Sequence, residues 1–244
     1  MNRFTIKIIA ITTMLVDHMG AILFPTSIYP QAIWLRVIGR LAFPLFAWMI
    51  AQGFRYTHSR RKYLIRLLVF AVICEVPFQL AFPGHGTNVL WTLALGLTAI
   101  TAWEANEDKV LGAAAALACG VAALALQTDY DIYGVATIFL FHLFGESKDR
   151  SKLAASLLAL NLIYLPVSYG LWETILSNGD SWRILARLEN VILQTLSMLS
   201  LIFVFTYNGR PGPLKAKYLF YAFYPGHILI LYLIAHFGHI GIGI

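Results

Sequence analysis

Long apolar segments recur along the whole chain, and they leave few alternatives for its fold. A helix that spans a bilayer needs about 20 mostly apolar residues, and shorter ones occur in compact bundles. About nine such segments are present, covering residues 4–24, 33–54, 63–82, 89–103, 110–127, 132–144, 153–171, 184–207 and 218–237. We therefore predict an all-α protein, a polytopic transmembrane bundle of about nine helices. The sixth segment is short enough to be re-entrant.

The composition agrees with this prediction. Hydrophobic residues make up 59% of the chain and charged residues 12%, whereas an ordinary soluble domain is roughly 45–50% apolar and about 25% charged. Few polar stretches remain in which to place a soluble domain, so we predict one integral membrane domain over residues 1–244, with the lipid bilayer as a partner. The net charge of +6 is what basic cytoplasmic loops produce, and we expect no nucleic-acid binding.

The basic residues predict an orientation in the membrane. Fourteen of the 18 lie near the N-terminus or in alternate loops: Arg3, Lys7, Arg55, Arg60, Arg61, Lys62, Arg66, Lys109, Lys148, Arg150, Lys152, Arg210, Lys215 and Lys217. Because cytoplasmic loops collect Lys and Arg, we expect a bacterial plasma-membrane protein with its N-terminus in the cytoplasm and its C-terminus outside. Asp17 and His18 interrupt the first apolar segment and no small-x-small cleavage pattern follows, so we expect a retained helix rather than a signal peptide.

Ionisable and polar residues nevertheless occur inside the apolar segments. Such groups are costly in hydrocarbon, and they usually face a protein-lined cavity and have a function there. The set comprises Asp17, His18, Arg36, Arg40, Glu75, Asn88 and His227. In the predicted orientation all of them lie in the extracytoplasmic half except His227, which lies near the middle. The sequence therefore predicts one polar site at this depth.

The spacing of these residues limits how they interact. Asp17 and His18 are neighbours on a helix and point about 100° apart, so they do not face each other. Arg36 and Arg40 share one helix face, repel each other and stay charged, so they need anions. Asp17 and Glu75 are the candidates within the chain, and a substrate phosphate or carboxylate is the candidate outside it. A purely structural network of these four charges stays open.

The two histidines in this set have either a structural or a catalytic role. A buried histidine is often only a hydrogen-bonded core residue, but a neutral imidazole beside a charged cluster can also take a proton from an amine or hydroxyl. His227 follows Tyr224-Pro225-Gly226, where a helix can loosen locally. The sequence has no HExxH, CxxC, Walker A or GxSxG motif, and we predict no metal site.

Several motifs resemble those of the TraX family. They are Asp17-His18-Met-Gly20, Gly39-Arg40-Leu-Ala-Phe-Pro44, Gly53-Phe-Arg-Tyr-Thr57, Glu75-Val-Pro77-Phe78 and Tyr221-Ala-Phe-Tyr224-Pro225-Gly-His227. The resemblance is dense through residue 78 and weak between residues 108 and 217. The family is named for a conjugation protein that acetylates the N-terminus of pilin. More distantly, the chain resembles the membrane-bound acyltransferase superfamily.

The resemblance implies acyl transfer from cytoplasmic acetyl-CoA to an amine or hydroxyl of an extracytoplasmic peptide or glycan. His18 matches the superfamily's histidine in an early helix and would be the general base. For such a reaction we expect catalytic roles for Asp17, Arg36 and Arg40, which would stabilise charge, and substrate contacts for Glu75, Asn88, Tyr224 and His227. CoA phosphates need cations, and we expect Arg55, Arg61 and Arg66 on the cytoplasmic side to supply them. Topology alone also places basic residues at the last three positions.

Two other functional classes stay open. Buried His, Asp, Glu and Arg also form proton relays in transporters. Transporters often contain paired repeats with matching broken helices, and the sequence shows none. The third class is a non-catalytic assembly factor for a pilus or another surface structure.

Overall fold

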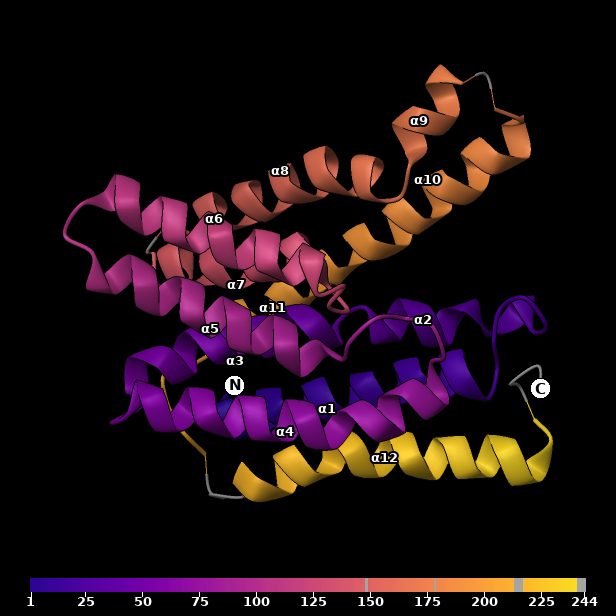
Figure 1. Cartoon of the computed structure of the whole chain (residues 1–244), viewed down its shortest axis with the longest axis horizontal. Coiled ribbons are helices and arrows are strands. Elements are labelled where there is room, and N and C mark those ends of the chain that lie inside the picture. The colour runs from indigo at the N-terminus through magenta and orange to yellow at the C-terminus, as the bar shows by residue number, and fades with distance from the viewer. Residues whose placement is uncertain (148, 178, 213–216, 241–244) are drawn as a thin grey trace.

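The protein forms a bundle of helices that run back and forth along one axis (Figure 1). The computed structural model describes residues 1–147, 149–177, 179–212 and 217–240. Its helices are α1 (Arg3–Ile22), η1 (Pro30–Ala32), α2 (Ile33–Gly39), α3 (Ala42–Tyr56), α4 (Arg60–Ala81), α5 (Val89–Ala105), α6 (Lys109–Ala125), α7 (Asp131–Phe144), α8 (Arg150–Ser168), α9 (Leu171–Leu176), α10 (Ser181–Thr195), η2 (Leu196–Ser200), α11 (Leu201–Phe205) and α12 (Lys217–Gly238). Within the described residues, β structure is limited to one isolated bridge between Thr87 and Thr128. The predicted all-α fold class is confirmed.

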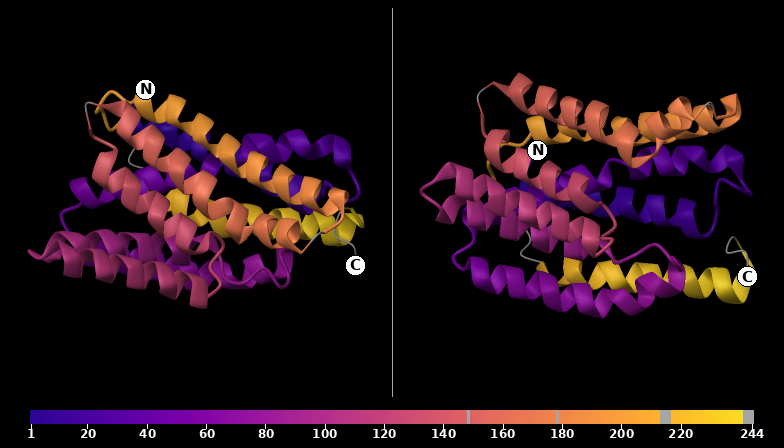
Figure 2. Two further views of the ribbon diagram at one scale, coloured as in Figure 1. Left: turned by 90° about the horizontal axis from the view of Figure 1, so that it is seen from above. Right: turned by 45° about the horizontal axis from the view of Figure 1, so that its top comes forward.

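Each predicted segment corresponds to one pass through the bundle. Within the described residues, five passes are long and apolar enough to cross a membrane: Arg3–Ile22, Pro30–Tyr56, Arg60–Ala81, Arg150–Ser168 and Ser181–Phe205. The helices α5, α6 and α7 are apolar but shorter, and α12 is the ninth pass. The α8 and α10 helices lie side by side, as do α4 and α12 (Figure 2). The chain is an integral membrane protein.

The alternating direction of the helices gives the bundle two distinct ends. At one end the backbone N–H of Arg3 donates to the carbonyl of Arg210 over 2.9 Å, and Arg55 pairs with Glu146 at 2.8 Å. At the other end Asp129 N–H donates to the Thr87 carbonyl over 3.0 Å. The loops that carry the basic residues meet at the first end, which we call the basic end. Lys148 and Lys215 lie outside the described residues.

The short sixth segment crosses the bundle as α7. Its 14 residues span roughly 21 Å at about 1.5 Å per residue. It begins at Asp131, beside the loop that contains Thr128, and ends just before Glu146 at the basic end. A crossing here keeps the later loops on the sides that the sequence predicts. The N-terminus therefore lies at the basic end and the C-terminal end of α12 at the opposite end (Figure 1).

The second segment is broken, whereas the sequence predicts one continuous helix over residues 33–54. Helix α2 ends at Gly39 and α3 begins at Ala42. Pro44, in the first turn of α3, has no N–H with which to continue the hydrogen-bond ladder to Arg40. Arg40 consequently lies at the break, where its side chain can leave the helix axis toward α1.

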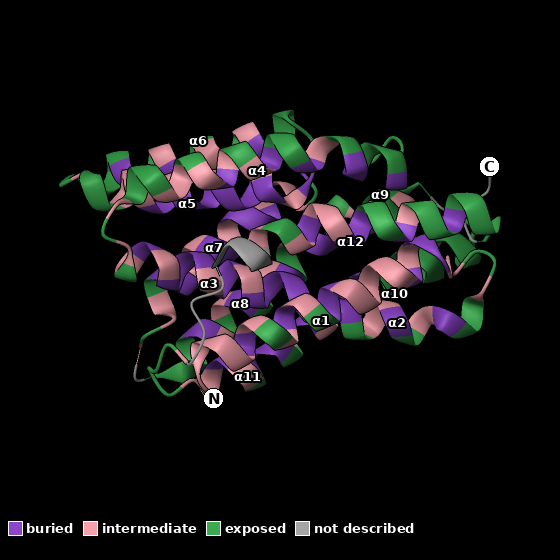
Figure 3. Cartoon of the chain, turned by 90° about the horizontal axis from the view of Figure 1, so that it is seen from below, coloured by how far each residue is buried: buried purple, intermediate pink, exposed green. Residues whose placement is uncertain are grey.

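The inner helices are enclosed, and the outer helices expose apolar faces (Figure 3). In α3, Phe43, Leu45 and Trp48 are almost completely buried. Val72 and Val76 of α4 are instead 61% and 67% exposed. Exposed apolar side chains along the outside of a helical bundle suit contact with lipid chains rather than with water.

Candidate functional site

Two histidines from distant parts of the sequence meet inside the bundle. Nδ1 of His18, near the end of α1, lies 2.7 Å from Nε2 of His227, in the middle of α12. Their rings are nearly parallel, with centroids 4.9 Å apart. His227 Nδ1 lies 2.7 Å from the carbonyl oxygen of Phe223, one turn earlier in α12. The sequence placed both histidines in the site but did not predict that they touch. It also allowed α12 to loosen near Pro225, and the helix instead runs on without a break.

The Phe223 carbonyl fixes the direction of the hydrogen bonds in this pair. A carbonyl oxygen can only accept, so His227 Nδ1 carries a proton and donates it. In a neutral imidazole the other nitrogen then accepts, and His18 Nδ1 donates to it. The lone pair on His18 Nε2 is left without a hydrogen-bond partner among the described residues. His18 is therefore oriented as a proton acceptor.

Asp17, next to His18 in the sequence, binds both arginines. One oxygen of its carboxylate lies 2.9 Å from Arg36 and the other lies 3.3 Å from Arg40. The Asp17 backbone carbonyl also accepts from Arg36 over 3.0 Å. The three side chains are 13–25% exposed, so these are largely enclosed charges. The predicted pairing of Asp17 with Arg36 and Arg40 is confirmed.

A glycine makes this pairing possible. Gly39 lies between the two arginines in sequence, and a Cβ placed there would fall 2.1 Å from Oδ1 of Asp17. At Gly20, a Cβ would fall 2.8 Å from Cβ of Leu35. Both positions let α1 and α2 approach closely enough for Asp17 to reach both guanidinium groups. This close approach gives a physical reason for two glycines of the family-like motifs.

A buried polar chain extends from this cluster into the later helices, and the sequence did not predict it. Arg40 donates to Gln194 Oε1 over 3.1 Å, and the Gln194 amide lies 3.5 Å from the Tyr133 hydroxyl. Tyr133 in turn donates to Asn161 over 3.3 Å. Gln194 and Asn161 are polar residues within apolar segments, which was the available signal. They join α7, α8 and α10 to the site.

Asp17, His18, Arg36 and Arg40 line one cavity of about 710 Å³, which we call the polar cavity. Asp129, from the loop before α7, and Asp131, the first residue of α7, also line it, as does Tyr224 of α12. Partial desolvation inside the cavity raises the pKa of Asp129 to about 6, although part of the residue remains exposed to water. Arg40 opposes this shift and Asp17 adds to it. At neutral pH the Asp129 carboxylate is thus mostly ionised.

The formal charges in the polar cavity nearly cancel. Its lining includes three carboxylates, those of Asp17, Asp129 and Asp131, and two guanidinium groups. A metal ion is not needed for this balance. Across the described residues, no three His, Cys, Asp or Glu side chains come close enough together to hold a metal ion.

Glu75 does not pair with the arginines, so that part of the prediction is wrong. Its carboxylate accepts instead from Asn88 Nδ2 over 2.6 Å, Gln79 Nε2 over 2.8 Å and Trp91 Nε1 over 3.1 Å. Asn88 is fully buried, and its side chain also caps the N-terminus of α5. These two residues join α4 to α5, and neither is among the residues that line the polar cavity.

The three arginines expected to bind CoA have different surroundings. Arg55 is bound to Glu146 at 2.8 Å and to the His142 carbonyl. Arg61 is exposed on the first turn of α4. Arg66 faces a second cavity, at the basic end, together with Arg3 and Lys7 of α1. The sequence analysis had used Arg3 and Lys7 only as indicators of orientation.

Comparisons with known proteins place these features in a family context. A family model described as TraX protein matches residues 2–235, a range that includes both histidines. The chain is 32% identical to the probable fimbrial assembly protein FimC, serogroup H1, of Dichelobacter nodosus, with 94% of each chain covered. It is 29% identical to Protein TraX of Escherichia coli over 68% of this chain and 64% of that one. No solved structure matches the chain.

Proposed function

The chain belongs to the TraX protein family, and we propose that it is a membrane-embedded acyltransferase. It would move an acetyl group from acetyl-CoA to an amine or hydroxyl of an extracytoplasmic peptide or glycan. The observation that carries the proposal is the His18–His227 pair, which leaves His18 Nε2 available inside a polar cavity. A core histidine with only a structural role would be expected to use both ring nitrogens.

The reaction uses this nitrogen as a general base and then as a general acid. As the acceptor nitrogen or oxygen attacks the thioester carbonyl carbon, its proton passes to His18 Nε2. The tetrahedral intermediate then breaks its C–S bond. The departing CoA sulfur takes the proton back from His18, so the enzyme ends in its starting state. His227 positions the His18 ring and fixes its tautomer without touching the reacting atoms.

The two arginines supply positive charge at the same cavity wall. Arg36 and Arg40 are held by Asp17, so their guanidinium groups are in place before any substrate arrives. Fixed donors of this kind stabilise a developing oxyanion or bind an anionic part of a substrate. In the proposed reaction, Arg36 or Arg40 would therefore stabilise the oxyanion of the tetrahedral intermediate or bind an anionic group of a substrate.

A second candidate is a non-catalytic factor in pilus or fimbrial assembly. The observation that favours it is the name of the Dichelobacter nodosus relative, a probable fimbrial assembly protein. A proton-coupled transporter would use the same buried ionisable groups. Both alternatives predict a protein that leaves acetyl-CoA unchanged.

Purified protein in nanodiscs, incubated with acetyl-CoA radiolabelled in the acetyl group, separates the candidates. An acyltransferase should label an acceptor peptide or glycan, itself, or water as released acetate. We expect His18→Ala to lose transfer by a factor of about 10²–10⁴, as general-base loss typically does. The matched control is His58→Ala, an exposed histidine outside the polar cavity. Residual activity above about a tenth would exclude His18 as the base, and no labelling by the wild type would favour the alternatives.

We also propose that the basic end lies in the cytoplasm, because basic loops are retained there. The polar cavity then opens toward the extracytoplasmic half. The test uses a membrane-impermeant thiol reagent and a Cys119→Ala background, since Cys119 is half-buried and Cys74 is buried. Ser177→Cys, at the opposite end, should be labelled in intact cells, and Glu107→Cys, at the basic end, only after the membrane is opened. The reverse pattern would invert the orientation.

A further inference from the structure

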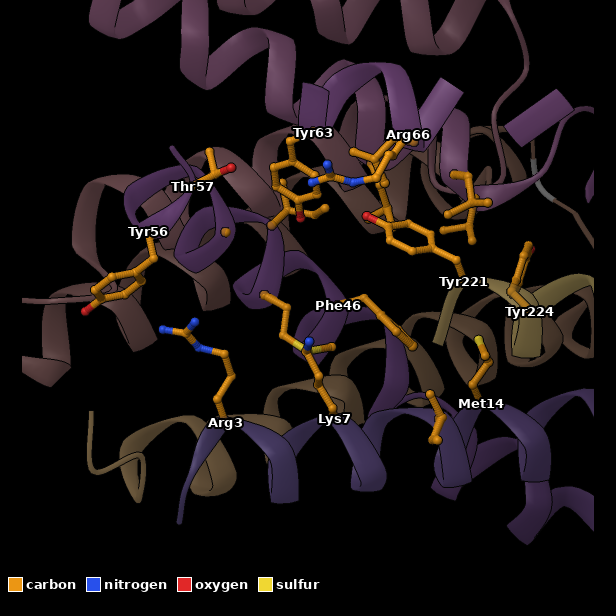
Figure 4. Close-up of a pocket in the computed structure, with 18 residues that line it drawn as sticks. Arg3, Lys7, Met14, Phe46, Tyr56, Thr57, Tyr63, Arg66, Tyr221 and Tyr224 are labelled. Atoms are coloured by element: carbon orange, nitrogen blue, oxygen red, sulfur yellow. The ribbon is translucent and has the colours of Figure 1, made fainter. Parts of the chain in front are cut away.

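A second cavity opens at the basic end of the bundle. It has a volume of about 410 Å³, and we call it the basic cavity. Arg3 and Lys7 project into it from α1, and Arg66 lies on the facing wall (Figure 4). Met14 and Tyr224 lie at its inner end (Figure 4). Three cations thus converge on one space from two helices.

Among the described residues, no carboxylate in the cavity balances the charge of Arg3 or Arg66. Among the described residues that line it, there is no Asp or Glu. Arg3 is stacked on the Tyr56 ring at 4.6 Å and donates to the Tyr207 hydroxyl over 3.3 Å. Within the described part of the chain, neither Arg3 nor Arg66 lies within ion-pair distance of a carboxylate. Partly enclosed cations that face one another repel, and an anionic ligand would relieve that repulsion.

Topology alone does not account for this arrangement. The positive-inside rule explains basic residues in loops and near helix ends, and it applies to Arg60 or Arg61, which are exposed. It does not require side chains from different helices to face the same cavity. Lys7 lies in the second turn of α1, inside the apolar segment. The convergence of Arg3 and Arg66, from different helices, on one cavity points to an anionic ligand.

The basic cavity adjoins the polar cavity. Four residues line both of them: Met14, Phe46, Val89 and Tyr224. Along α1, Arg3 and Met14 are eleven residues apart, roughly 16 Å at 1.5 Å per residue, and His18 is about one turn further on. The Tyr224 ring lies 6.2 Å from the His18 ring. A ligand held by its anionic head at Arg3 would therefore need a long, narrow tail to reach the shared wall.

We propose that the basic cavity is the donor site and that Arg3, Lys7 and Arg66 bind the phosphates of acyl-CoA. The pantetheine arm would lie along the apolar part of the cavity, formed by residues such as Ile11, Met49 and Leu90. The thioester would then reach the shared wall at Met14 and Tyr224, next to His18. The inference rests on the proposed acyl transfer, and it assigns the donor and the acceptor to different cavities.

Direct binding of CoA tests the site separately from catalysis. Equilibrium dialysis with radiolabelled CoA would be done on the full chain in nanodiscs of neutral lipid, with thermal melting to verify that each variant is folded. We expect Arg66→Ala and Arg3→Ala each to raise the Kd about tenfold or more, as loss of a charge-assisted hydrogen bond does. Arg60→Ala is the matched control, an exposed arginine on the same helix that does not line the cavity. Pantetheine lacks the nucleotide phosphates, so its Kd should be the same for Arg66→Ala and for the wild type.

The outcomes separate the two proposals. His18→Ala should bind CoA like the wild type and lose only transfer. If Arg60→Ala weakens CoA binding as much as Arg66→Ala does, the assignment of the donor site is overturned although the enzyme remains an acyltransferase. If the wild type binds no CoA, the proposed function fails as well. A phospholipid headgroup carries the same phosphate chemistry, so the dialysis is repeated in anionic nanodiscs. A gain of thermal stability from anionic lipid that Arg66→Ala removes, without CoA binding, would assign the cavity to lipid.

Discussion

The two cavities of this protein hold their charges in opposite ways. In the polar cavity, Asp17 lies between Arg36 and Arg40, and two further carboxylates face the same space. In the basic cavity, three cations share a space whose described lining contains no carboxylate. The polar cavity is therefore ordered by its own residues before any ligand arrives. In the basic cavity, Arg3 and Arg66 have no carboxylate within ion-pair distance among the described residues, and under the donor-site proposal the phosphates of the ligand would supply that negative charge.

The strongest test of this difference is to remove the central anion. Asp17→Asn leaves two partly buried guanidinium groups without their partner, and loss of one member of a buried pair costs about 3–5 kcal/mol. We expect a large fall in melting temperature in detergent, together with loss of transfer. Arg36 and Arg40 would then lack the carboxylate that holds them in place. An unchanged melting temperature would mean that water or a ligand already screens the arginines.

Glu75→Gln is the matched control for this substitution. Glu75 is also a carboxylate within a membrane-spanning helix, but its described partners are neutral donors on Asn88, Gln79 and Trp91. The amide keeps its size and one acceptor oxygen, so we expect a smaller loss of about 1–3 kcal/mol. Equal losses of stability for both variants would mean that Asp17 does no more for the fold than Glu75 does through its hydrogen bonds to neutral donors.

The second test keeps every charge and changes only the approach of two helices. Gly39→Ala would place a Cβ 2.1 Å from the Asp17 carboxylate, so Asp17 has to move away from Arg36 and Arg40. We expect a loss of stability of roughly 2–3 kcal/mol, the upper range for overpacking a close contact, and less than for Asp17→Asn because the charges remain. Gly120→Ala is the control, since its Cβ would meet Ile132 at an ordinary 3.6 Å. It should be neutral or raise the melting temperature, as Ala favours a helix by about 1 kcal/mol over Gly.

The sequence predicted the passes of the bundle from apolar length, and it predicted the pairing of Asp17 with the arginines because two buried cations at similar depth need an anion. Apolar length identifies helices, and an i, i+4 pair of arginines shares one face wherever the helix packs. The error at Glu75 has a different origin. Depth in the membrane was predictable for that residue, but its neighbours around the bundle were not. Glu75 and the arginines lie at similar depth on helices that present them to different partners.

The contact between His18 and His227 shows the same limit more sharply. The two residues are separated by 209 positions, and helical periodicity says which face a residue occupies but not which helix lies opposite. Likewise, the positive-inside rule already accounts for Arg3 and Lys7. The sequence therefore offered no reason to expect that they share a cavity with Arg66. The assignment of donor residues by sequence therefore stopped at Arg55, Arg61 and Arg66, and only the last of these faces the basic cavity.

The smallest expected effect concerns the remaining charge of the polar cavity. The pKa of Asp129 is raised from 3.8 to about 6, so the folded state favours its protonated form. The ionised form consequently lowers stability above pH 6, and this penalty fades as the pH falls toward 3.8. Asp129→Asn should raise the melting temperature at pH 8 and raise it less at pH 5. Because the side chain also reaches the water in the cavity, screening keeps the gain below about 1 kcal/mol. Glu107→Gln, exposed and outside both cavities, should change neither value. If Asp129→Asn instead lowers the melting temperature at pH 8, the attraction between the Asp129 carboxylate and Arg40 outweighs the cost of desolvation. Asp129 would then stabilise the arginines of the polar cavity together with Asp17, and the two cavities would differ even more in how their charges are held.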